Sequence, residues 1–379
     1  MSNNESLSIQ EPLFMEKKLK IMPFQIIEMA DSFALKRGVS TIVIPDKNAM
    51  IVVRVIQKAL AQDSYTAKEL GELFSATSRE LILTFIESLI ERRFIVPLDN
   101  TNTTQNNAGH TAESPQDIFY WHFNKYQSII TEKLNEKPWA FVGINELSKR
   151  LISAIKTEGK DSIIVIDDPG LRRIEFFDDK FLCVDPFWHQ STLNIMNDDE
   201  FKQESPDIGF IVAATEFGSF MLLDEWNEYA IAHDVPFYPV VLQNMVGYAG
   251  PLVIPGNSAC LECLKHRQNS NNANFLEKRA IEKFAFEGQH VAAYHNSMLT
   301  VLAQVGIFDL IKFSNNIQWD VGALCEIDLL SGTMLRRKLI KAPRCNACSS
   351  AVQKPDVNIQ KQMTTDEAWK EIEQTVGHE

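Results

Sequence analysis

Three short apolar-rich runs stand near the start of the chain, and segments with helical periodicity follow. The three runs are residues 24–29, 31–37 and 40–45. Their β-branched and aromatic residues predict three strands. The segments with apolar residues at helical spacing are 46–63, 66–75 and 77–94. Three strands followed by three amphipathic helices predict a small winged-helix-like domain over residues 1–98.

A polar stretch then separates this domain from a longer pattern. Residues 99–117 hold few apolar side chains and many Asn and Thr, which predicts a linker because such a segment cannot pack a core. Beyond it, apolar runs alternate with helical ones, and this βαβ alternation predicts a doubly wound α/β body over residues 118–352. Residues 353–379 form a tail with an acidic, helix-like end, either a docking element or a solvated terminus.

Composition narrows the function classes. The chain has 379 residues, of which 45% are hydrophobic, and a formal net charge of −13. No uninterrupted apolar run reaches the ~18 residues of a membrane span, and the N-terminus lacks a signal-peptide pattern. We therefore expect a cytoplasmic protein without a membrane partner. The negative charge also disfavours nucleic acid as a partner.

Four of the six cysteines stand in two CxxC pairs, far apart in the sequence: Cys260, Cys263, Cys345 and Cys348. In a reducing cytosol, this pattern favours a tetrahedral four-thiolate zinc over a disulfide. Such a zinc is structural because no coordination position remains for substrate. A thioredoxin-like dithiol and coincidence are the alternatives. Cys183 and Cys325 stand alone and are expected to be buried small hydrophobes.

The first strand-to-helix turn of the body argues against nucleotide binding. Residues 142–147 contain one glycine, Gly143, followed by bulky residues and Glu146. A dinucleotide or adenylate site needs several glycines here so that backbone amides approach phosphate. Asp167 and Asp168 at the next strand end then favour capping or solvated carboxylates over a ribose or magnesium site.

Several segments of the body resemble the ThiF/MoeB branch of the ubiquitin-activating-enzyme-like superfamily. The resemblance is carried by VIDDPGLRRIEFF at 165–177, VAATEF at 212–217, the stretch 238–267 around the first CxxC pair, and APRCNACSS at 342–350. It implies an adenylation fold with a four-cysteine zinc. The phosphate glycines and the aspartate-rich segment of active members are missing, which implies a degenerate nucleotide site.

The degenerate body behind a winged-helix-like module resembles more closely the ThiF-like C protein of azoline-forming YcaO cyclodehydratases, which make thiazole/oxazole-modified peptides. That resemblance implies that residues 1–98 are a RiPP recognition element. The leader of a ribosomal precursor peptide would add as a strand between the module's third strand and third helix. The implied contact residues are Ser40, Thr41, Ile42, Val43, Ile44, Ile82 and Phe85. Ile82 and Phe85 could instead face the module's own core, and the rest of the protein could cover the strand edge.

The same resemblance implies the partners and leaves no catalytic residue in this chain. A YcaO-type cyclodehydratase would bind ATP and convert Cys, Ser or Thr of the precursor to azolines, and an FMN-dependent dehydrogenase often oxidises these to azoles. We also expect a homodimer within a larger complex. The alternatives are an active ThiF-like adenylating enzyme acting on a peptide or carrier-protein C-terminus, and a zinc-stabilised DNA-binding regulator.

Overall fold

The computed structural model describes residues 16–38, 40–97, 115–123, 125, 127–270, 275–286, 293–317 and 321–349. The chain divides into two compact units, unit 1 (Met1–Ile130) and unit 2 (Thr131–Glu379). Most of the predicted linker and the whole predicted tail lie outside the described residues. The module limits drawn from the sequence therefore stay predictions.

Unit 1 contains the predicted strands and helices together with strands that the sequence pattern did not indicate. The strands are β1 (Lys18–Ile21), β2 (Gln25–Glu28), β3 (Phe33–Arg37), β4 (Ser40–Ile44), β5 (Tyr65–Thr66) and β6 (Ile95–Pro97). The helices are α1 (Ala49–Gln62), α2 (Ala67–Glu72), α3 (Arg79–Glu91) and α4 (Pro115–Trp121). A capping box formed by Thr66 and Glu69 starts α2, as the sequence predicts. The apolar sides of α1, α2 and α3 close over one core with β1 and β3.

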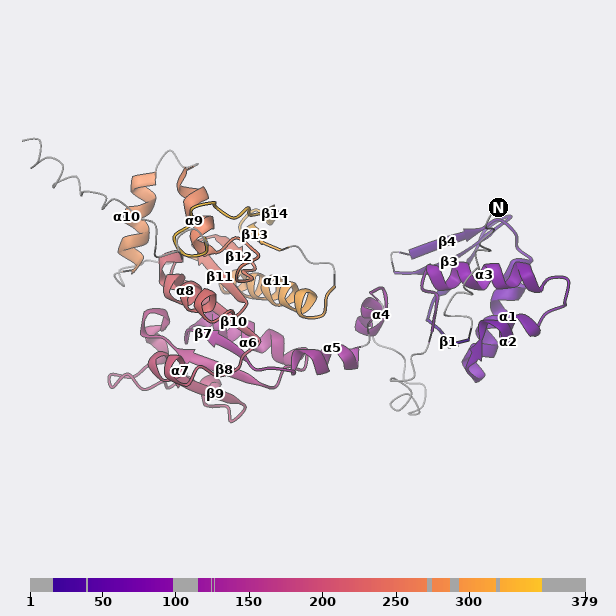
Figure 1. Ribbon diagram of the computed structural model, residues 1–379, viewed down its shortest axis with the longest axis horizontal. Coiled ribbons are helices and arrows are strands. Elements are labelled where there is room, and N and C mark those ends of the chain that lie inside the picture. Colours follow the sequence, from indigo (N-terminus) through magenta and orange to yellow (C-terminus); the bar gives the residue numbers. More distant parts are fainter. Residues whose placement is uncertain are drawn as a thin grey trace, which may run out of the picture. The chain divides into compact units, whose positions relative to one another are not determined.

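The sheets of unit 1 leave two predicted strands, β2 and β4, at edges. One sheet has the antiparallel order β2-β3-β4, and the other has the order β5-β1-β6. Within the described residues, β4 pairs only with β3, so its other side is an edge of the sheet (Figure 1). Its residues alternate between half-buried and exposed, and the Val43 side chain is 60% exposed.

Unit 2 is built on one eight-stranded sheet, in the order β14-β13-β12-β11-β10-β7-β8-β9. Its strands are β7 (Trp139–Val142), β8 (Ile163–Asp167), β9 (Leu193–Asn197), β10 (Phe210–Thr215), β11 (Phe237–Gln243), β12 (Val246–Ala249), β13 (Ala323–Asp328) and β14 (Thr333–Lys338). The five strands from β9 to β11 are parallel, and the three beyond them are antiparallel. Four of the parallel strands, β7, β8, β10 and β11, are buried on both sides, so they read as continuous apolar runs in the sequence, whereas the edge strand β9 is partly exposed.

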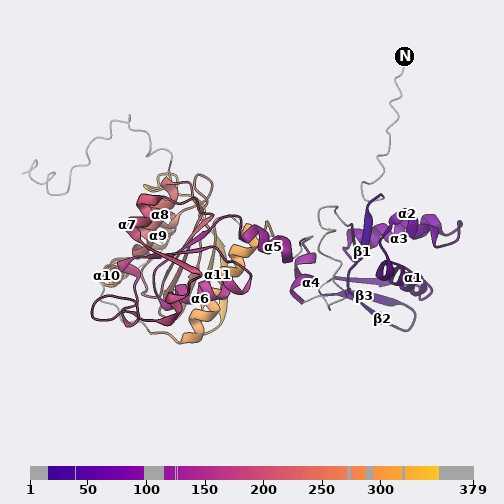
Figure 2. The same ribbon diagram turned by 90° about the horizontal axis from the view of Figure 1, so that it is seen from below.

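Helices cover both faces of this sheet. They are α5 (Gln127–Leu134, which crosses the boundary of the two units), α6 (Glu146–Thr157), α7 (Asp198–Glu204), α8 (Asp224–Ala232), α9 (Leu261–Ser270), α10 (Phe275–Phe286) and α11 (Asn296–Ser314). α6 and α11 pack on one face, and α7, α8 and α9 lie over the other (Figure 2). This is the predicted doubly wound α/β body.

α11 is the one helix in the described part of the chain that is long and apolar enough, by length and composition, to cross a membrane. It nevertheless carries Asp309, which accepts hydrogen bonds from Tyr238 and Arg336 and pairs with Lys312 at 2.6 Å. α11 packs on α6, β11 and β12. Its apolar residues Leu302, Ile307 and Leu310 are buried there, as in the core helix of a sheet protein.

Candidate functional site

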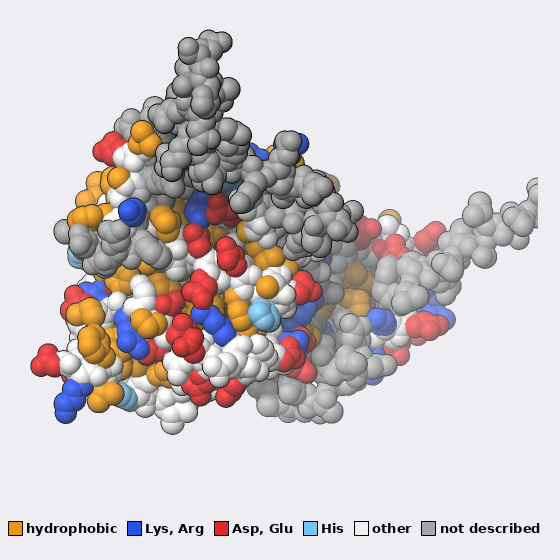
Figure 3. All heavy atoms as spheres, turned by 60° about the vertical axis from the view of Figure 1, so that its left-hand side comes forward, with side chains coloured by type: hydrophobic (Ala, Val, Ile, Leu, Met, Phe, Trp, Pro, Cys, Tyr) orange, Lys and Arg blue, Asp and Glu red, His pale blue; other side chains and the backbone are white. Residues whose placement is uncertain are grey.

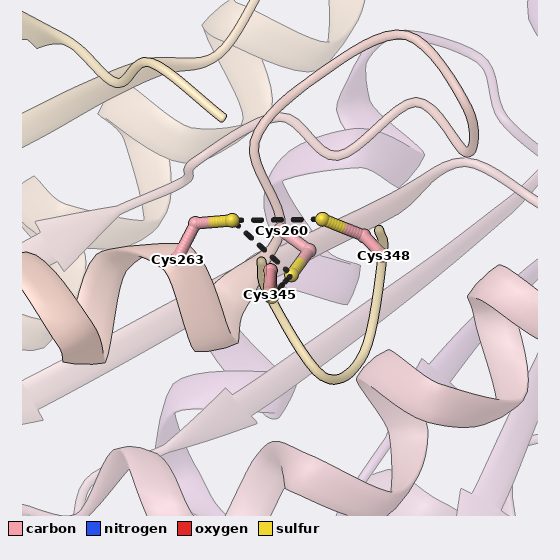
Figure 4. A group of neighbouring side chains, drawn as sticks. All are labelled: Cys260, Cys263, Cys345 and Cys348. Carbon is pink, nitrogen blue, oxygen red and sulfur yellow. Dashed lines mark hydrogen bonds between the residues drawn. The ribbon is translucent and has the colours of Figure 1, made fainter. Parts of the chain in front are cut away.

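The four paired cysteines meet in the core of unit 2. Cys260 and Cys263 lie at the start of α9, and Cys345 and Cys348 follow β14 (Figure 4). All four are buried, and their sulfur atoms lie within 4.8 Å of one another. The closest pairs are Cys263 with Cys348 at 3.5 Å, Cys260 with Cys345 at 3.6 Å and Cys260 with Cys263 at 3.8 Å.

These distances fit a single tetrahedral metal. Four sulfurs at ~2.3 Å from zinc lie roughly 3.8 Å apart, whereas a disulfide joins its sulfurs at about 2 Å. The Cys263 sulfur also accepts the Ala342 N–H at 3.3 Å, a bond that suits a thiolate. A hydrogen bond from Cys260 lowers the pKa of Cys263 to about 4, and burial raises the pKa of Cys348 to about 12. The cluster is consistent with the predicted zinc site.

A second cluster lies where α6 begins, at the point where the strand order reverses between β7 and β10. Asn145 is fully buried and caps α6 by accepting the Ser148 N–H at 2.9 Å. Its amide donates to the carbonyls of Leu171 at 3.0 Å and Ala214 at 2.9 Å. Gly143 has a φ of +100°, and a Cβ there would lie 2.7 Å from the Asn145 amide nitrogen. The Asn145 side chain therefore fills the space beside this turn.

The N-terminus of α6 holds a carboxylate of the same chain. Glu216, which follows β10, is 1% exposed and accepts the Leu147 N–H at 2.8 Å. Its other oxygen accepts from Arg173 Nη1 at 2.7 Å, and the same nitrogen donates to the Tyr294 hydroxyl at 2.8 Å. Burial raises the pKa of the Glu216 carboxyl, and Arg173 and the Leu147 N–H partly offset this effect. An anion is the ligand that a helix N-terminus favours, and here Glu216 supplies it.

The space beside this cluster is acidic. A cavity of roughly 370 Å³ is lined by Glu146, Arg173, Glu175, Phe176, Val184, Asp185 and Asn296. Three carboxylates against one guanidinium disfavour a nucleotide phosphate. Asp167 pairs with Arg172 at 2.7 Å, and Asp168 accepts from Trp226 Nε1 at 2.7 Å and caps the following turn. Asp168 thus caps a turn, as the sequence favoured, whereas Asp167 is ion-paired, which the sequence did not indicate.

Acidic side chains also gather on the side of the molecule that Figure 3 brings forward. α7 has four Asp and Glu residues and α8 has three, against one lysine, Lys202. A surface of this sign repels a polyanion.

The residues predicted to contact a peptide fall into two groups in unit 1, an edge strand and a helix that packs on the core. Ser40–Ile44 is the edge strand β4, whose Ile42 and Ile44 half-bury their side chains against the core. On α3, Ile82 is 4% exposed and faces the module's own core, while Phe85 is half-buried at the border of that core. Ile82 thus has almost no surface left for a peptide, because it contributes to the packing of α3.

Solved structures show the same fold at low sequence identity. E. coli MccB bound to MccA has a TM-score of 0.62 and 15% identity, and the match covers 88% of this chain and 100% of that one. The microcin C7 biosynthetic enzyme MccB in complex with N-formylated MccA has a TM-score of 0.63 and 15% identity, and that match covers 88% of this chain and 100% of the enzyme. A heterocyclase in complex with substrate and cofactor has a TM-score of 0.56 at 14% identity. That match covers 88% of this chain but 40% of the heterocyclase.

No protein-family model and no curated protein matches this sequence. The structural likenesses confirm the predicted fold class, an α/β chain in which a small N-terminal domain precedes a ThiF-type Rossmann-like sheet with a four-cysteine cluster.

Several residues of these sites were not singled out from the sequence. Arg173, Tyr294 and the role of Glu216 as an internal ligand depend on contacts between residues 43 to 121 positions apart. The one available signal was Glu216 itself, an acidic residue directly after a strand of the expected nucleotide site.

Mutation of the cluster tests the zinc assignment. We expect about one zinc per chain, and we expect Cys263→Ser to lose the zinc and lower the unfolding temperature, because three thiolates bind the metal more weakly than four. Cys325→Ser is the matched control, since Cys325 is 1% exposed but lies in β13 outside the cluster. Metal analysis by mass spectrometry measures the content. Equal zinc in both variants would contradict the assignment.

The internal carboxylate at α6 is expected to be structural. Glu216→Ala should lower the free energy of unfolding by roughly 1–3 kcal/mol, because it leaves Arg173 and the Leu147 N–H without their acceptor. Glu175→Ala removes a 70% exposed carboxylate from the same Arg173, and should change stability by less than ~0.5 kcal/mol. Urea denaturation followed by the buried tryptophans of unit 2 makes the measurement. Similar losses in the two variants would refute this role.

Proposed function

We propose that this chain is a non-catalytic recognition and scaffold subunit. It binds the leader of a ribosomal precursor peptide and presents the peptide to a YcaO-type cyclodehydratase. That partner performs the ATP-dependent conversion of Cys, Ser or Thr to azolines.

The free edge of β4 carries this proposal. An edge strand presents unpaired N–H and C=O groups to which an extended peptide adds as a new strand. A cavity lies beside the start of β4, between Ser40–Ile42 and the C-terminal end of α3. The main chain of β4 would supply affinity, and the cavity would select a side chain.

The absence of catalysis is supported by the site at α6. A nucleotide would need the α6 N-terminus for its phosphates, and Glu216 already accepts the Leu147 N–H there. Displacing this carboxylate would leave Arg173 to pair with the phosphate, but Glu146 and Asp185 line the same cavity. We infer that this chain binds no nucleotide and that the chemistry belongs to a partner.

The heterocyclase likeness fits this division of labour. Its chain, solved with substrate and cofactor, contains the present fold as 40% of its length. We propose that the remaining functions reside in a separate YcaO-type protein here, and that an FMN-dependent azoline dehydrogenase and a second copy of this chain join the complex. Zinc at Cys260, Cys263, Cys345 and Cys348 would be structural, and the complex would be cytoplasmic.

An active adenylating enzyme is the second candidate. The match to MccB spans nearly all of that chain, and MccB has been solved with ATP and with AMPCPP. In this candidate, Glu216 would have to move from the α6 N-terminus when nucleotide binds.

ATP–pyrophosphate exchange separates the two candidates. We expect the isolated chain to give no exchange above background with candidate acceptor peptides, because the phosphate position is filled by Glu216. E. coli MccB, assayed in parallel, controls for the conditions. Robust exchange by this chain alone would establish the adenylating enzyme and exclude the scaffold role.

Strand addition is tested by a proline in β4. Arg37 and Ser40 flank a two-residue turn, so the alternation of an antiparallel ladder turns the Val43 N–H to the free edge. Val43→Pro should weaken binding of the full chain to a synthetic peptide from a neighbouring short open reading frame about 10-fold or more.

Val43→Ala keeps the N–H and should change the affinity less than about threefold. Fluorescence anisotropy of the labelled peptide measures both variants. Unchanged binding by Val43→Pro would exclude addition at this edge.

A further inference from the structure

The cavity beside β4 is positively charged, in a chain of net charge −13. It measures roughly 420 Å³ and lies wholly within unit 1. Its lining residues are Arg37, Ser40, Thr41, Ile42, Glu91, Arg92, Arg93, Phe94 and His122. Three guanidinium groups and one imidazole therefore face one carboxylate.

Arg37 is the unusual member of this set. Its side chain comes from the end of β3, directly before the turn into β4, and the residue is 3% exposed. Nη1 donates to the Arg93 carbonyl, and the guanidinium lies 5.4 Å from the centre of the Phe94 ring. Nε and Nη2 are buried and have no hydrogen-bond partner in the described part of the chain. A buried guanidinium usually pairs with a carboxylate, and this one has none among the described residues.

The neighbours of Arg37 add positive charge. Arg93 Nη1 donates to the His122 carbonyl, which places a second guanidinium beside the cavity. Burial and the nearby Arg93 lower the pKa of Arg37. Burial, Arg37 and Arg93 lower the pKa of His122. Each group is thus held in a field that disfavours further positive charge.

Among the described residues, no carboxylate pairs with Arg37. Glu91, the one acidic residue that lines the cavity, is exposed, and no ion pair within these residues joins it to Arg37. In this part of the chain, the Arg37 charge therefore has no anionic partner.

We propose that this cavity binds the carboxylate of an Asp or Glu side chain on the peptide that adds to β4. The inference rests on the proposed function and names the chemistry of its specificity. Arg92 and Arg93, exposed at the rim, would hold the carboxylate oxygens by charge-assisted hydrogen bonds. Arg37 beneath them would stabilise the bound charge from a site that water screens weakly.

Strand geometry places a side chain at the cavity. Side chains of an added strand alternate between the two faces of the sheet, so every second residue of the peptide points toward the groove between β4 and α3. Ser40, Thr41 and Ile42 line the cavity at one end of β4. An acidic residue at one fixed position of the peptide is the expected specificity signal.

A carboxylate fits better than a nucleic acid phosphate. The cavity adjoins an edge strand, which recruits a polypeptide, and Glu91 lines it beside the arginines, where it would repel a polyanion. The planar guanidinium fork also matches a carboxylate in two-point contact.

Selection from a displayed library of random peptides by the full chain tests the proposal. Recovered peptides should share an Asp or Glu at one position. Arg93→Gln and Arg37→Met should each lose this enrichment. Arg79→Gln, on an exposed residue at the start of the same helix and outside the cavity, should keep it.

For one recovered peptide, changing its acidic residue to the amide should weaken binding to the unmodified chain about 10- to 100-fold. The same change should have little effect on binding to Arg93→Gln. Arg93→Glu should instead recover peptides with Lys or Arg at that position.

The outcomes distinguish failure of the carboxylate site from failure of strand addition at β4. Peptides that lack a shared acidic position, or acidic peptides still enriched by both arginine variants, would overturn the carboxylate site and leave strand addition standing. Recovery of no peptide, or of peptides whose binding Val43→Pro does not weaken, would overturn the proposed function as well.

Stability gives a readout that a purely structural arginine would not produce. Because Arg37 is a buried charge with no anionic partner among the described residues, Arg37→Met should leave unit 1 as stable as before or more stable, while its peptide affinity falls. Hydrogen exchange of residues 16–97 in the full chain measures this, since the first tryptophan is Trp121. Faster exchange in Arg37→Met, with acidic selection kept by Arg93→Gln, would show that Arg37 is structural and refute the site.

Discussion

Four sulfur atoms fix the chain path through unit 2. The pairs Cys260 with Cys345 and Cys263 with Cys348 each join residues 85 positions apart. The segment between the two pairs contains α10, α11, β13 and β14. The cluster therefore holds together the two ends of the segment that forms α11 and the outer antiparallel strands of the sheet. The cysteines also belong to the apolar core that contains Trp226. A metal here would tie the fold together without taking part in chemistry, because four ligands fill its shell.

With the scaffold fixed, the reversal of strand order between β7 and β10 is the place where such sheets usually bind ligands. In this chain, the polar groups at that place satisfy one another. Asn145 joins the ends of β7 and β10, and Glu216 takes the anion position at α6. A buried carboxylate with a guanidinium and a backbone N–H as donors is a stable arrangement, and a ligand would gain little by replacing it.

The sequence predicted what local patterns determine. The three amphipathic helices of unit 1, the βαβ order of unit 2 and the spacing of the cysteine pairs all follow from residues close in the chain. The sites depend on distant residues: Arg37 meets Arg93 across 56 positions, and Leu147 meets Glu216 across 69. Helical periodicity also left open whether Ile82 and Phe85 face the core of unit 1 or a bound peptide, because the apolar face of this helix is wide enough for both. The sequence pattern did not indicate β1, because the four residues KLKI are too short an alternation to distinguish a strand from an irregular polar segment.

Two arginines, one in each unit, differ in how their charge is paired. Arg173 in unit 2 has its carboxylate within the chain, so its charge stabilises the fold and is closed to ligands. Arg37 in unit 1 is more deeply buried, and yet two of its nitrogens have no acceptor in the part of the chain that the structure describes. An unpaired buried charge lowers the stability of the free protein, so it persists where a partner supplies the missing anion. An arginine–carboxylate pair thus occupies the N-terminus of α6 in unit 2. In unit 1 the arginine awaits its carboxylate, which in our proposal the bound peptide supplies.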